Sequence, residues 1–268
     1  MAVAVAVMDV NMLRVAALVQ YTGKSFSGSQ YQVGVRTVQA ELERALSLYL
    51  RSPIKASFSG RTDRGVHAAG QVIHFDVEQD ELDLWRFCWA LNGILPNDVS
   101  ISRAQIVPDT FHARFSARKR EYVYRILNRP QRSALLKDTH HFVFRSLDQD
   151  RMKAASTALL GSHDFQAFRS TNADKTSTIC DVSRAELLNL GEGQLEFWIA
   201  ANHFVYNMVR IVVGTLIEIG LGQRAPESLS EALVACDRNL AGPTAPPWGL
   251  SLNSVEYPEA YALFESNS

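Results

Sequence analysis

Stretches with the residue spacing of β-strands and stretches with the spacing of α-helices alternate along this chain in two successive series. In the first series, the apolar and β-branched run at 13–21 predicts a buried strand. Apolar residues at three- and four-residue intervals in 36–50 predict a helix, for which Thr37 is a suitable N-cap. A second strand is predicted at 71–77, and a short helix in 83–96, which ends at an Asn-Gly pair and a proline.

The second series follows a seam near residues 105–120. In chain order it predicts strands at 121–127 and 140–145, a helix from Asp148 to Gly161, a hairpin of 181–190 with 194–200, a mostly buried helix within 202–220, a helix that opens with a Ser228/Glu231 capping box, and a strand after a Pro-rich loop in 242–258. Two such series predict an α+β fold in two halves with a mixed sheet. We place the halves at 11–110 and 111–262.

Composition sets broad limits on the class of protein. The 268 residues, of which 47% are hydrophobic, suffice for one large domain or two small ones, and a charged share of 21% argues against disorder. The formal net charge of −1 does not by itself indicate a nucleic-acid partner. Evidence for such a partner must therefore come from local patches of charge.

Three features that the sequence lacks bear on the cellular compartment of the protein. The three cysteines lie far apart and form no CxxC pair, which argues against a disulfide framework and a cysteine zinc site and favours a reducing compartment. The apolar first 13 residues contain no basic residue before Arg14, unlike a secretory or transit leader. Apolar runs are interrupted before they reach the length of a membrane span. The sequence therefore favours a cytoplasmic protein.

The segment SGRTDRGVHAAGQVIHFDV at 59–77 places a lone acid, Asp63, between Arg61 and Arg64. Glycines on both sides let the backbone turn sharply and approach a ligand closely, so Asp63 is expected to project from a loop just before a strand. A neighbouring or remote arginine would lower the pKa of Asp63 and keep its carboxylate ionised. An ionised carboxylate acts as a nucleophile or as a base.

Two other interpretations of this segment remain open on composition alone. The first is an Asx-turn flanked by surface arginines, which is the commoner use of such residues. The second is a metal site made by His67, His74 and Asp76, of which the last two share one face of the predicted strand. His67 lies in the turn, however, and no further cluster of ligands is evident, so the metal interpretation is the weaker one.

A basic stretch at 112–132 is the best local argument for a nucleic-acid partner. Basic side chains contact phosphates and aromatic side chains stack on bases, as recognition of single-stranded or looped RNA requires. A solvated, charged strand is the alternative. The stretch contains one acid, Glu121, among Arg114, Phe115, Arg118, Lys119, Arg120, Tyr122, Tyr124, Arg125, Arg129 and Arg132.

Arg210 is the third candidate, because it stands between Val209 and Ile211 in an apolar helix. A guanidinium in such a place must find a carboxylate or a phosphate, since its burial without a partner is costly. The alternative is an arginine whose stem crosses the apolar surface so that its charge reaches water. With Asp63 in one half and Arg210 in the other, we expect a cleft between the halves.

These residues lie in segments that resemble the TruA family of tRNA pseudouridine synthases. GRTDRGVHAAGQVIHF (60–75) resembles the catalytic segment of that family, and other landmarks follow in the family's order over nearly the whole chain. They are RTVQAELERAL, FHARFSARKREYVYRI, GSHDFQAFR, FVYNMVRIVVGTL and GLSLNSVEYP. Several motifs in register are more specific than any one of them.

The resemblance implies a role for each candidate residue. Asp63 corresponds to the essential aspartate, Arg210 to the arginine that pairs with it, and Tyr122 to the tyrosine that contacts the target uracil. Arg61 corresponds to the arginine associated with displacing the target nucleotide. The resemblance and the basic stretch together predict an RNA-binding set of Arg61, Phe111, His112, Ala113, Arg114, Phe115, Arg118 and Arg120.

The resemblance also implies a fold and an activity. The fold is two pseudo-symmetric halves of the ferredoxin-like or RRM-like type, with mixed, mainly antiparallel sheets and a central active-site cleft. Members act as homodimers on tRNA, need neither metal nor cofactor, and isomerise uridine to pseudouridine in the anticodon stem-loop, nominally at positions 38, 39 and 40. Whether Asp63 attacks the sugar or removes a proton from it stays open. An RNA N-glycosidase and a non-catalytic RNA-binding protein are the alternatives.

Three positions depart from the family pattern. Arg64 follows the catalytic aspartate where a small residue is common, and Thr22 replaces the usual acid after Tyr21. The segment FSGSQYQ lacks the tryptophan expected near Ser29. None of these changes removes a catalytic group, but they put in doubt which tRNA positions are modified and how the loop before 34 contacts RNA.

Overall fold

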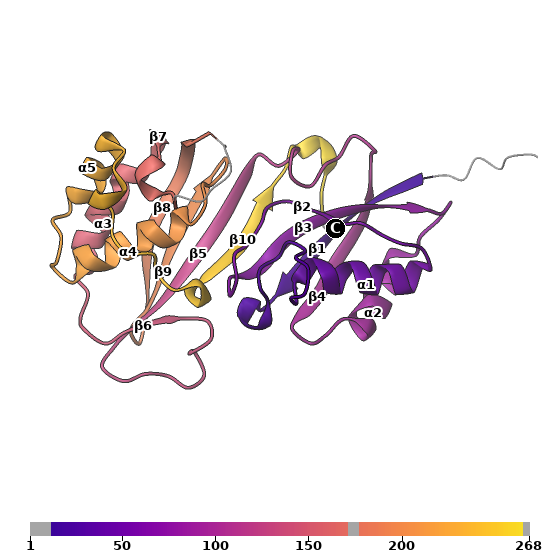
Figure 1. The fold of residues 1–268 in the computed structure, drawn as a ribbon, viewed down its shortest axis with the longest axis horizontal. Helices are drawn as coiled ribbons and strands as arrows, with labels where there is room; N and C mark the ends of the chain where they lie inside the picture. Colours follow the sequence, from indigo (N-terminus) through magenta and orange to yellow (C-terminus); the bar gives the residue numbers. More distant parts are fainter. Residues whose placement is uncertain (1–11, 171–176, 265–268) are drawn as a thin grey trace, which may run out of the picture.

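The computed structural model describes residues 12–170 and 177–264, so the N-terminal segment used to argue against a leader lies outside the described residues. Within these residues the strands form a ten-stranded sheet (Figure 1). The strands are β1 (Met12–Tyr21), β2 (Ser57–Phe58), β3 (His67–Glu78), β4 (Val99–Val107), β5 (Lys119–Asn128), β6 (His141–Val143), β7 (Gly161–Asp164), β8 (Ile179–Gly191), β9 (Gln194–Ala201) and β10 (Leu250–Glu256). The α-helices are α1 (Val38–Leu50), α2 (Leu84–Ile94), α3 (Gln149–Ser156), α4 (Met208–Gly220) and α5 (Ser228–Ala235).

The sheet consists of the same arrangement used twice. In the first half the spatial order is β4-β1-β3, with β2 on the far edge of β3, and α1 and α2 connect the strands. In the second half the order is β10-β5-β9-β8, connected by α3 and α4. Each half thus reads strand, helix, strand, strand, helix, strand, with neighbouring strands antiparallel, which is the ferredoxin-like arrangement. Parallel pairs occur between β10 and β3 and between β5 and β6. The predicted α+β class with a mixed, mainly antiparallel sheet is confirmed.

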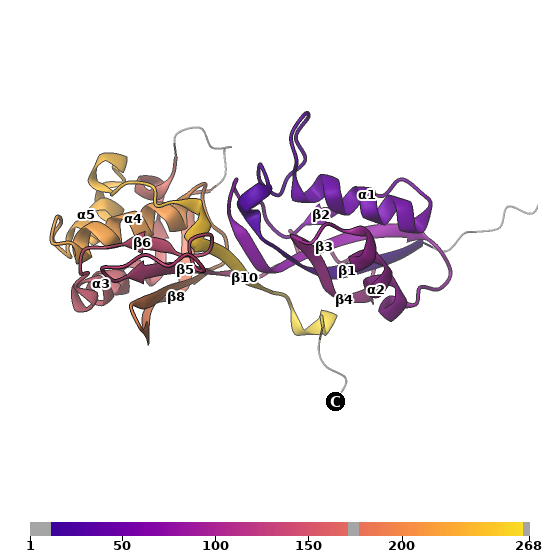
Figure 2. The same cartoon turned by 90° about the horizontal axis from the view of Figure 1, so that it is seen from below.

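The two halves have separate hydrophobic cores that meet at β10. The first core forms where α1 and α2 cover β1 and β3, and the second where α3, α4 and α5 cover β5, β8 and β9. Alternate residues of β10 serve both cores, since Leu250 belongs to the second and Leu252 to the first. Figure 2 shows β10 running between the halves. Because β10 pairs with both β3 and β5, the last strand of the chain joins the halves into one sheet.

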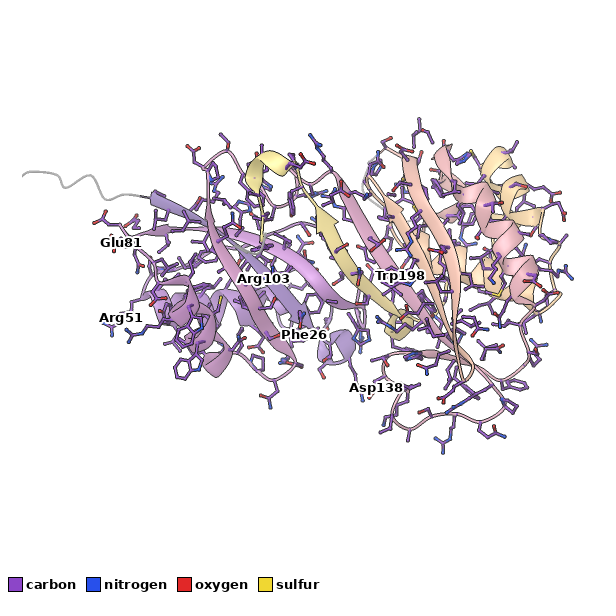
Figure 3. All side chains as sticks on the ribbon, turned by 180° about the vertical axis from the view of Figure 1, so that it is seen from behind. Phe26, Arg51, Glu81, Arg103, Asp138 and Trp198 are labelled. Atoms are coloured by element: carbon purple, nitrogen blue, oxygen red, sulfur yellow. The ribbon has the colours of Figure 1, made fainter. Side chains whose placement is uncertain are left out.

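A polar contact at one rim adds to this connection. Lys24, in the short 3-10 turn after β1, pairs with Asp138 of the second half at 2.9 Å. Asp138 and the nearby Phe26 are labelled at this junction in Figure 3. Both partners of the pair are exposed to water, so the ion pair adds little to the stability of the junction. The shared strand therefore sets the relation between the halves more than the ion pair does.

Several local predictions are confirmed by their hydrogen bonds. Thr37 caps α1 by accepting from Ala40 N at 3.3 Å, and Asp148 caps α3 by accepting from Arg151 N at 3.0 Å. The predicted hairpin is β8 with β9, and its turn places Gly191, Glu192 and Gly193 at positive φ. Two flanking glycines make this turn possible, because they adopt that conformation without strain.

Other predictions were wrong or incomplete. The buried helix predicted within 202–220 begins at Met208, and 202–207 is a loop. The capping box is absent: Ser228 Oγ donates to Ala225 O at 2.7 Å, and Glu227 is the N-cap of α5. Strand β3 begins at His67 rather than at residue 71. Strands β2, β4 and β7 were not predicted, and β2 and β7 are too short to show a two-residue period.

Among the helices of residues 12–170 and 177–264, none combines the length and the hydropathy needed to cross a membrane.

Candidate active site

The loop that carries Asp63 lies between β2 and β3 and is fixed from below by buried hydrogen bonds. Ser29 holds both sides of Thr62: its N–H donates to Thr62 O at 3.0 Å, and its Oγ accepts from Thr62 N at 2.8 Å. The Thr62 hydroxyl lies 2.7 Å from the Tyr21 hydroxyl. Gly28, at φ +105°, allows this approach, since an added Cβ would lie 3.1 Å from Thr62 O. Asp63 therefore projects from a rigid turn rather than a mobile loop.

The carboxylate of Asp63 faces Arg210 from the other half. Arg210 Nη1 lies 3.6 Å from Asp63 Oδ2, a distance that makes an ion pair without a direct hydrogen bond. The two side chains are 16% and 28% exposed, for Arg210 and Asp63 respectively. Arg210 is held by two further bonds, from Nε to Ala245 O at 2.8 Å and from Nη1 to Asn207 Oδ1 at 2.7 Å. The structure thus brings together the lone acid and the helical arginine across the junction.

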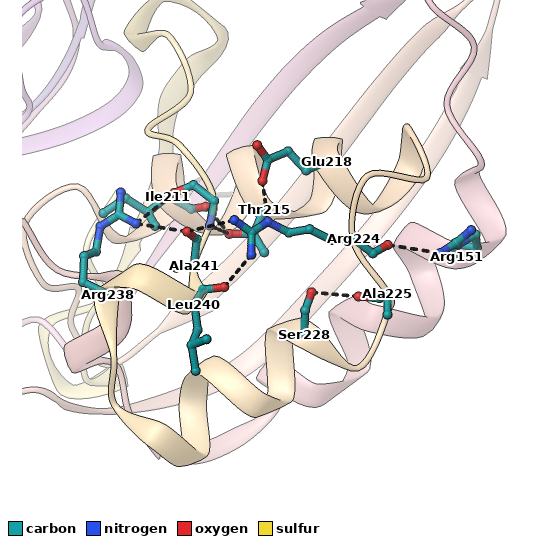
Figure 4. Close-up of polar contacts among 11 residues, drawn as sticks. Arg151, Ile211, Thr215, Glu218, Arg224, Ala225, Ser228, Arg238, Leu240 and Ala241 are labelled. Carbon is teal, nitrogen blue, oxygen red and sulfur yellow. Dashed lines mark hydrogen bonds and ion pairs between the residues drawn. The ribbon is translucent and has the colours of Figure 1, made fainter.

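The segment that supplies Ala245 is fastened to α4. Gly242 N donates to Thr215 Oγ1 at 2.8 Å, and Ala245 N donates to Arg210 O at 2.9 Å. Arg224 pairs with Glu218 of α4 and donates to Leu240 O, as Figure 4 shows. This segment packs so closely on the helix that an added Cβ at Gly214 would lie 1.8 Å from Pro243 O. A glycine in mid-helix is therefore required here.

Burial and the neighbouring charge shift the pKa of Asp63 in opposite directions. Removal from water raises the pKa of the Asp63 carboxyl, whereas the positive charge of Arg210 lowers it, and the net pKa lies above the ordinary value. A carboxylate with a raised pKa is a better base and nucleophile than an exposed one. Arg210 is the group that keeps it ionised in spite of burial.

Asp63 opens into a cleft of about 1120 Å³ between the halves. Tyr122, on β5, forms part of its wall and packs edge to face against Phe204, with ring centroids 5.0 Å apart. Burial raises the pKa of Tyr122, and the nearby Tyr21 hydroxyl and Asp63 carboxylate act in the same direction. Its hydroxyl is therefore neutral at physiological pH. Arg61, exposed at the start of the turn, also lines the cleft.

Three of the predicted RNA-binding residues form an aromatic and basic group at the mouth of this cleft. Phe115 is 77% exposed, and the ring of His112 lies against it at a centroid distance of 4.4 Å. The guanidinium of Arg114 lies 5.8 Å from the Phe115 ring centroid. The backbone N–H groups of Arg114 and Phe115 both donate to His112 Nδ1, so Nε2 carries the proton of the neutral ring. An exposed ring with a neighbouring cation suits stacking on a base.

Phe111 and Ala113 occupy a different environment from these three. Both are fully buried, and Phe111 packs against Tyr257 and Tyr261 at 5.1 Å. Ala113 N donates to His74 Nδ1 at 3.1 Å. The prediction that these two side chains contact RNA is at odds with this burial. Phe111 and Ala113 thus face the core, whereas His112, Arg114 and Phe115 line the cleft, a division that the sequence pattern does not reveal.

Arg120 also differs from the prediction. Its guanidinium donates to four backbone carbonyls at 2.7–3.1 Å, those of Ser59, Arg114, Ala117 and Asn202. Ser59 stands at the start of the turn that carries Asp63, and Asn202 belongs to the second half, so Arg120 joins both halves. With four N–H groups already donated, little of the guanidinium is left for phosphate contacts.

Other members of the basic stretch are paired with acids or lie outside the cleft. Arg125 pairs with Glu196 at 3.0 Å and Lys119 with Glu256 at 2.5 Å. Arg118 is exposed but does not line the cleft. Arg64 is exposed, and within the described ranges its guanidinium has no hydrogen bond or ion pair. The structure does not explain the arginine at that position.

The three residues of the metal interpretation have other partners. His67 Nδ1 accepts from Gly23 N at 3.1 Å and its Nε2 donates to Trp248 O at 3.0 Å, while His74 accepts from the backbone of Ala113. Asp76 binds Arg14 at 2.7 Å. In the part of the chain that the structure describes, no three histidine, cysteine or acidic residues are grouped closely enough to hold a metal ion.

Comparison with known proteins points to one family. A family model described as tRNA pseudouridine synthase matches residues 17–116 and 155–258. The chain is 42% identical over 252 residues to a tRNA pseudouridine synthase A of Paraburkholderia phytofirmans, an alignment that covers 94% of this chain and 93% of the relative. It is 41% identical over 246 residues to a protein of the same name from Exiguobacterium sp., covering 92% of this chain and 98% of the relative. A third, from Geobacillus sp., is 42% identical over 247 residues, or 91% and 98% of the two chains.

Proposed function

Because this chain belongs to the tRNA pseudouridine synthase family and is thus an isomerase, we propose that Asp63 carries out the isomerisation in the cleft between the halves. The observation that supports this most strongly is the approach of Arg210 to Asp63 at 3.6 Å. A carboxylate and a guanidinium from different halves meet in the cleft, and both side chains are mostly buried. Burial makes the carboxylate reactive, and the arginine holds it in the ionised form that the reaction needs.

The target uridine must leave the RNA stack before Asp63 can reach its sugar. Unstacking costs a few kcal/mol, which contacts with the protein must offset. We propose that Arg61 takes the place that the nucleotide vacates and that Tyr122 lies against the uracil. The neutral phenol of Tyr122 suits this position, because it offers an apolar ring face without a competing charge.

The chemistry exchanges one bond to the sugar for another. The bond between C1′ and N1 breaks, the detached uracil turns within the cleft, and C5 bonds to C1′. The proton on C5 is lost and N1 gains one, so atoms and charge balance without an oxidant or reductant. Asp63 starts this sequence either by attack on the sugar or by removal of a proton from it.

We further propose that the substrate is the anticodon stem-loop of tRNA, at positions 38, 39 and 40. The exposed Phe115, His112 and Arg114 at the cleft mouth suit a looped strand whose bases are splayed out. As in the family, the expected form is a cytoplasmic homodimer.

The product of the reaction tests this function. A tRNA transcript with uridine at positions 38 to 40 is incubated with the protein, and modified nucleosides are mapped by position. We expect pseudouridine at these positions and no free uracil. Release of uracil with abasic sites would establish the N-glycosidase alternative, which ordinarily uses a second carboxylate. Tight binding with neither product would establish a non-catalytic RNA-binding protein.

A further inference from the structure

We propose that Asn207 is a positioning residue that holds the guanidinium of Arg210 in place beside Asp63. The proposal rests on the function proposed above, in which Asp63 is the reactive group. Asn207 lies at the N-cap of α4, three residues before Arg210, and its side chain lines the cleft.

The backbone of Asn207 is the first observation. Its φ of 63° and ψ of 7° place it in the left-handed region, which residues other than glycine rarely adopt. Asparagine tolerates this region better than most residues, but it gains nothing from it as a helix cap here, because its side chain makes no capping hydrogen bond. An unusual backbone conformation beside a reactive group indicates that the side chain is held there for another purpose.

The side chain is the second observation. Asn207 Oδ1 accepts from Arg210 Nη1 at 2.7 Å, and Nδ2 donates to Ser170 Oγ at 2.9 Å. A guanidinium has no acceptor, so the oxygen of the amide must face Arg210 and the NH₂ group must face Ser170. The amide therefore has one orientation, fixed from both sides.

The two tethers of Arg210 have different effects. Ala245 O binds Nε, near the stem, and by itself leaves the planar guanidinium able to pivot as a whole about that hydrogen bond. Asn207 binds Nη1, the nitrogen that also lies 3.6 Å from Asp63 Oδ2. Asn207 thus determines where the charge of Arg210 stands relative to Asp63.

The neutrality of the amide matters as well as its shape. A carboxylate at the same position would accept the same hydrogen bond from Arg210, but its charge would compete with Asp63 for the guanidinium. Asparagine supplies the acceptor without the competing charge. Among the described residues that line this cleft, Asp63 is the one acid, and the other titratable side chains are Arg61, His112, Arg114, Arg120, Tyr122, His203, Tyr206 and Arg210.

Two substitutions of Asn207 distinguish the effect of its side chain from the effect of its backbone conformation. Asn207→Gly removes the amide and relieves the left-handed conformation, so the helix start is kept. Asn207→Asp keeps the size and the acceptor but adds a charge. The pKa of Asp63 is measured by carbon NMR of the full-length protein labelled at aspartate, with Asp63→Asn to assign its resonance. Turnover of a tRNA transcript is measured over the same pH range.

In both variants we expect the pKa of Asp63 to rise, because Arg210 stabilises the carboxylate less well. We also expect kcat to fall about 10- to 100-fold while KM for tRNA stays within about twofold, since misplacement of a reacting group acts on the chemical step. The acidic limb of the rate profile should move to higher pH. Ser170→Ala, which loosens the amide without touching Arg210, should give a smaller change of the same sign.

An unchanged Asp63 pKa in both folded variants would overturn the proposal, whatever happens to kcat. A fall in kcat that reflects only unfolding is recognised by circular dichroism and leaves the acidic limb unmoved, and it too would count against positioning. If Asp63→Asn retained turnover, the function proposed for Asp63 would fail. The NMR titration would still decide the role of Asn207.

Discussion

Acid should destabilise this protein through His74, a buried residue of β3. His74 is 6% exposed, and its Nδ1 accepts from Ala113 N at 3.1 Å, which requires the unprotonated ring nitrogen. Burial, together with the nearby charges of His112 and Arg14, lowers the pKa of His74 from 6.5 to about 4. Protonation would remove the acceptor that fixes the segment between the halves.

The loss of stability in acid follows from the pKa of His74 in the unfolded chain, 6.5, and in the folded protein, about 4. Between about pH 6.5 and pH 4 the unfolded chain binds a proton at this site and the folded protein does not, so the stabilisation is complete above pH 6.5 and is lost as the pH falls. At about pH 5 the loss through His74 is about 2 kcal/mol, and it approaches about 3 kcal/mol below pH 4.

His74→Asn isolates this contribution, because the asparagine Oδ1 is able to accept from Ala113 N and does not titrate. The free energy of unfolding in urea is measured for both proteins at about pH 7.5 and about pH 5. Wild type should lose about 2 kcal/mol more than the variant between the two pH values. Histidines common to both proteins cancel in this comparison. Equal losses would refute the assignment of the acid sensitivity to His74.

Three further predictions concern packing and RNA binding. Gly214→Ala should lower the free energy of unfolding by about 2–3 kcal/mol, because the new Cβ would lie 1.8 Å from Pro243 O. The control is Gly93→Ala, where a Cβ meets nothing within 4 Å. In the same urea titration the control should not lower the free energy of unfolding. Arg120→Met should lower the free energy of unfolding by about 2 kcal/mol or more, since four carbonyls lose their donor. The same substitution should leave the salt dependence of tRNA affinity unchanged. Arg118→Ala should leave stability within about 0.5 kcal/mol and reduce the slope of log affinity against log salt by about one, as measured by filter binding. The reverse pattern for the two arginines would contradict their assignment.

Features that depend on neighbouring residues were predictable from the sequence. Thr37 and Asp148 cap their helices, and the turn of the β8–β9 hairpin is where its glycines indicate. In each case the hydrogen bonds join residues within three or four positions, so the sequence contains both partners. The pairing of Asp63 with Arg210 is different: the residues alone left a neighbouring or a remote arginine as the partner of Asp63, and the resemblance to the family indicated Arg210.

Features that depend on tertiary contacts were not predictable from one sequence. Arg120 belongs to a basic stretch that is typical of RNA contact, yet its carbonyl partners come from segments up to 82 positions away. Phe111 and Phe115 look alike in the sequence, but the C-terminal aromatic residues cover the first and leave the second exposed. The position of Asn207 before the helix was not predictable, because the apolar helical pattern runs through 202–220 without a local signal that the helix begins at Met208.

The central claim, that Asp63 performs the isomerisation, is tested most directly by a single-turnover measurement on Asp63→Asn. This substitution keeps the size of the side chain and removes its charge. With enzyme in excess over a tRNA transcript, the rate of pseudouridine formation and the affinity for tRNA are measured on the same preparation. The structure predicts that binding is retained and that no pseudouridine forms above the level without enzyme. Pseudouridine formation within tenfold of the wild-type rate would contradict the claim.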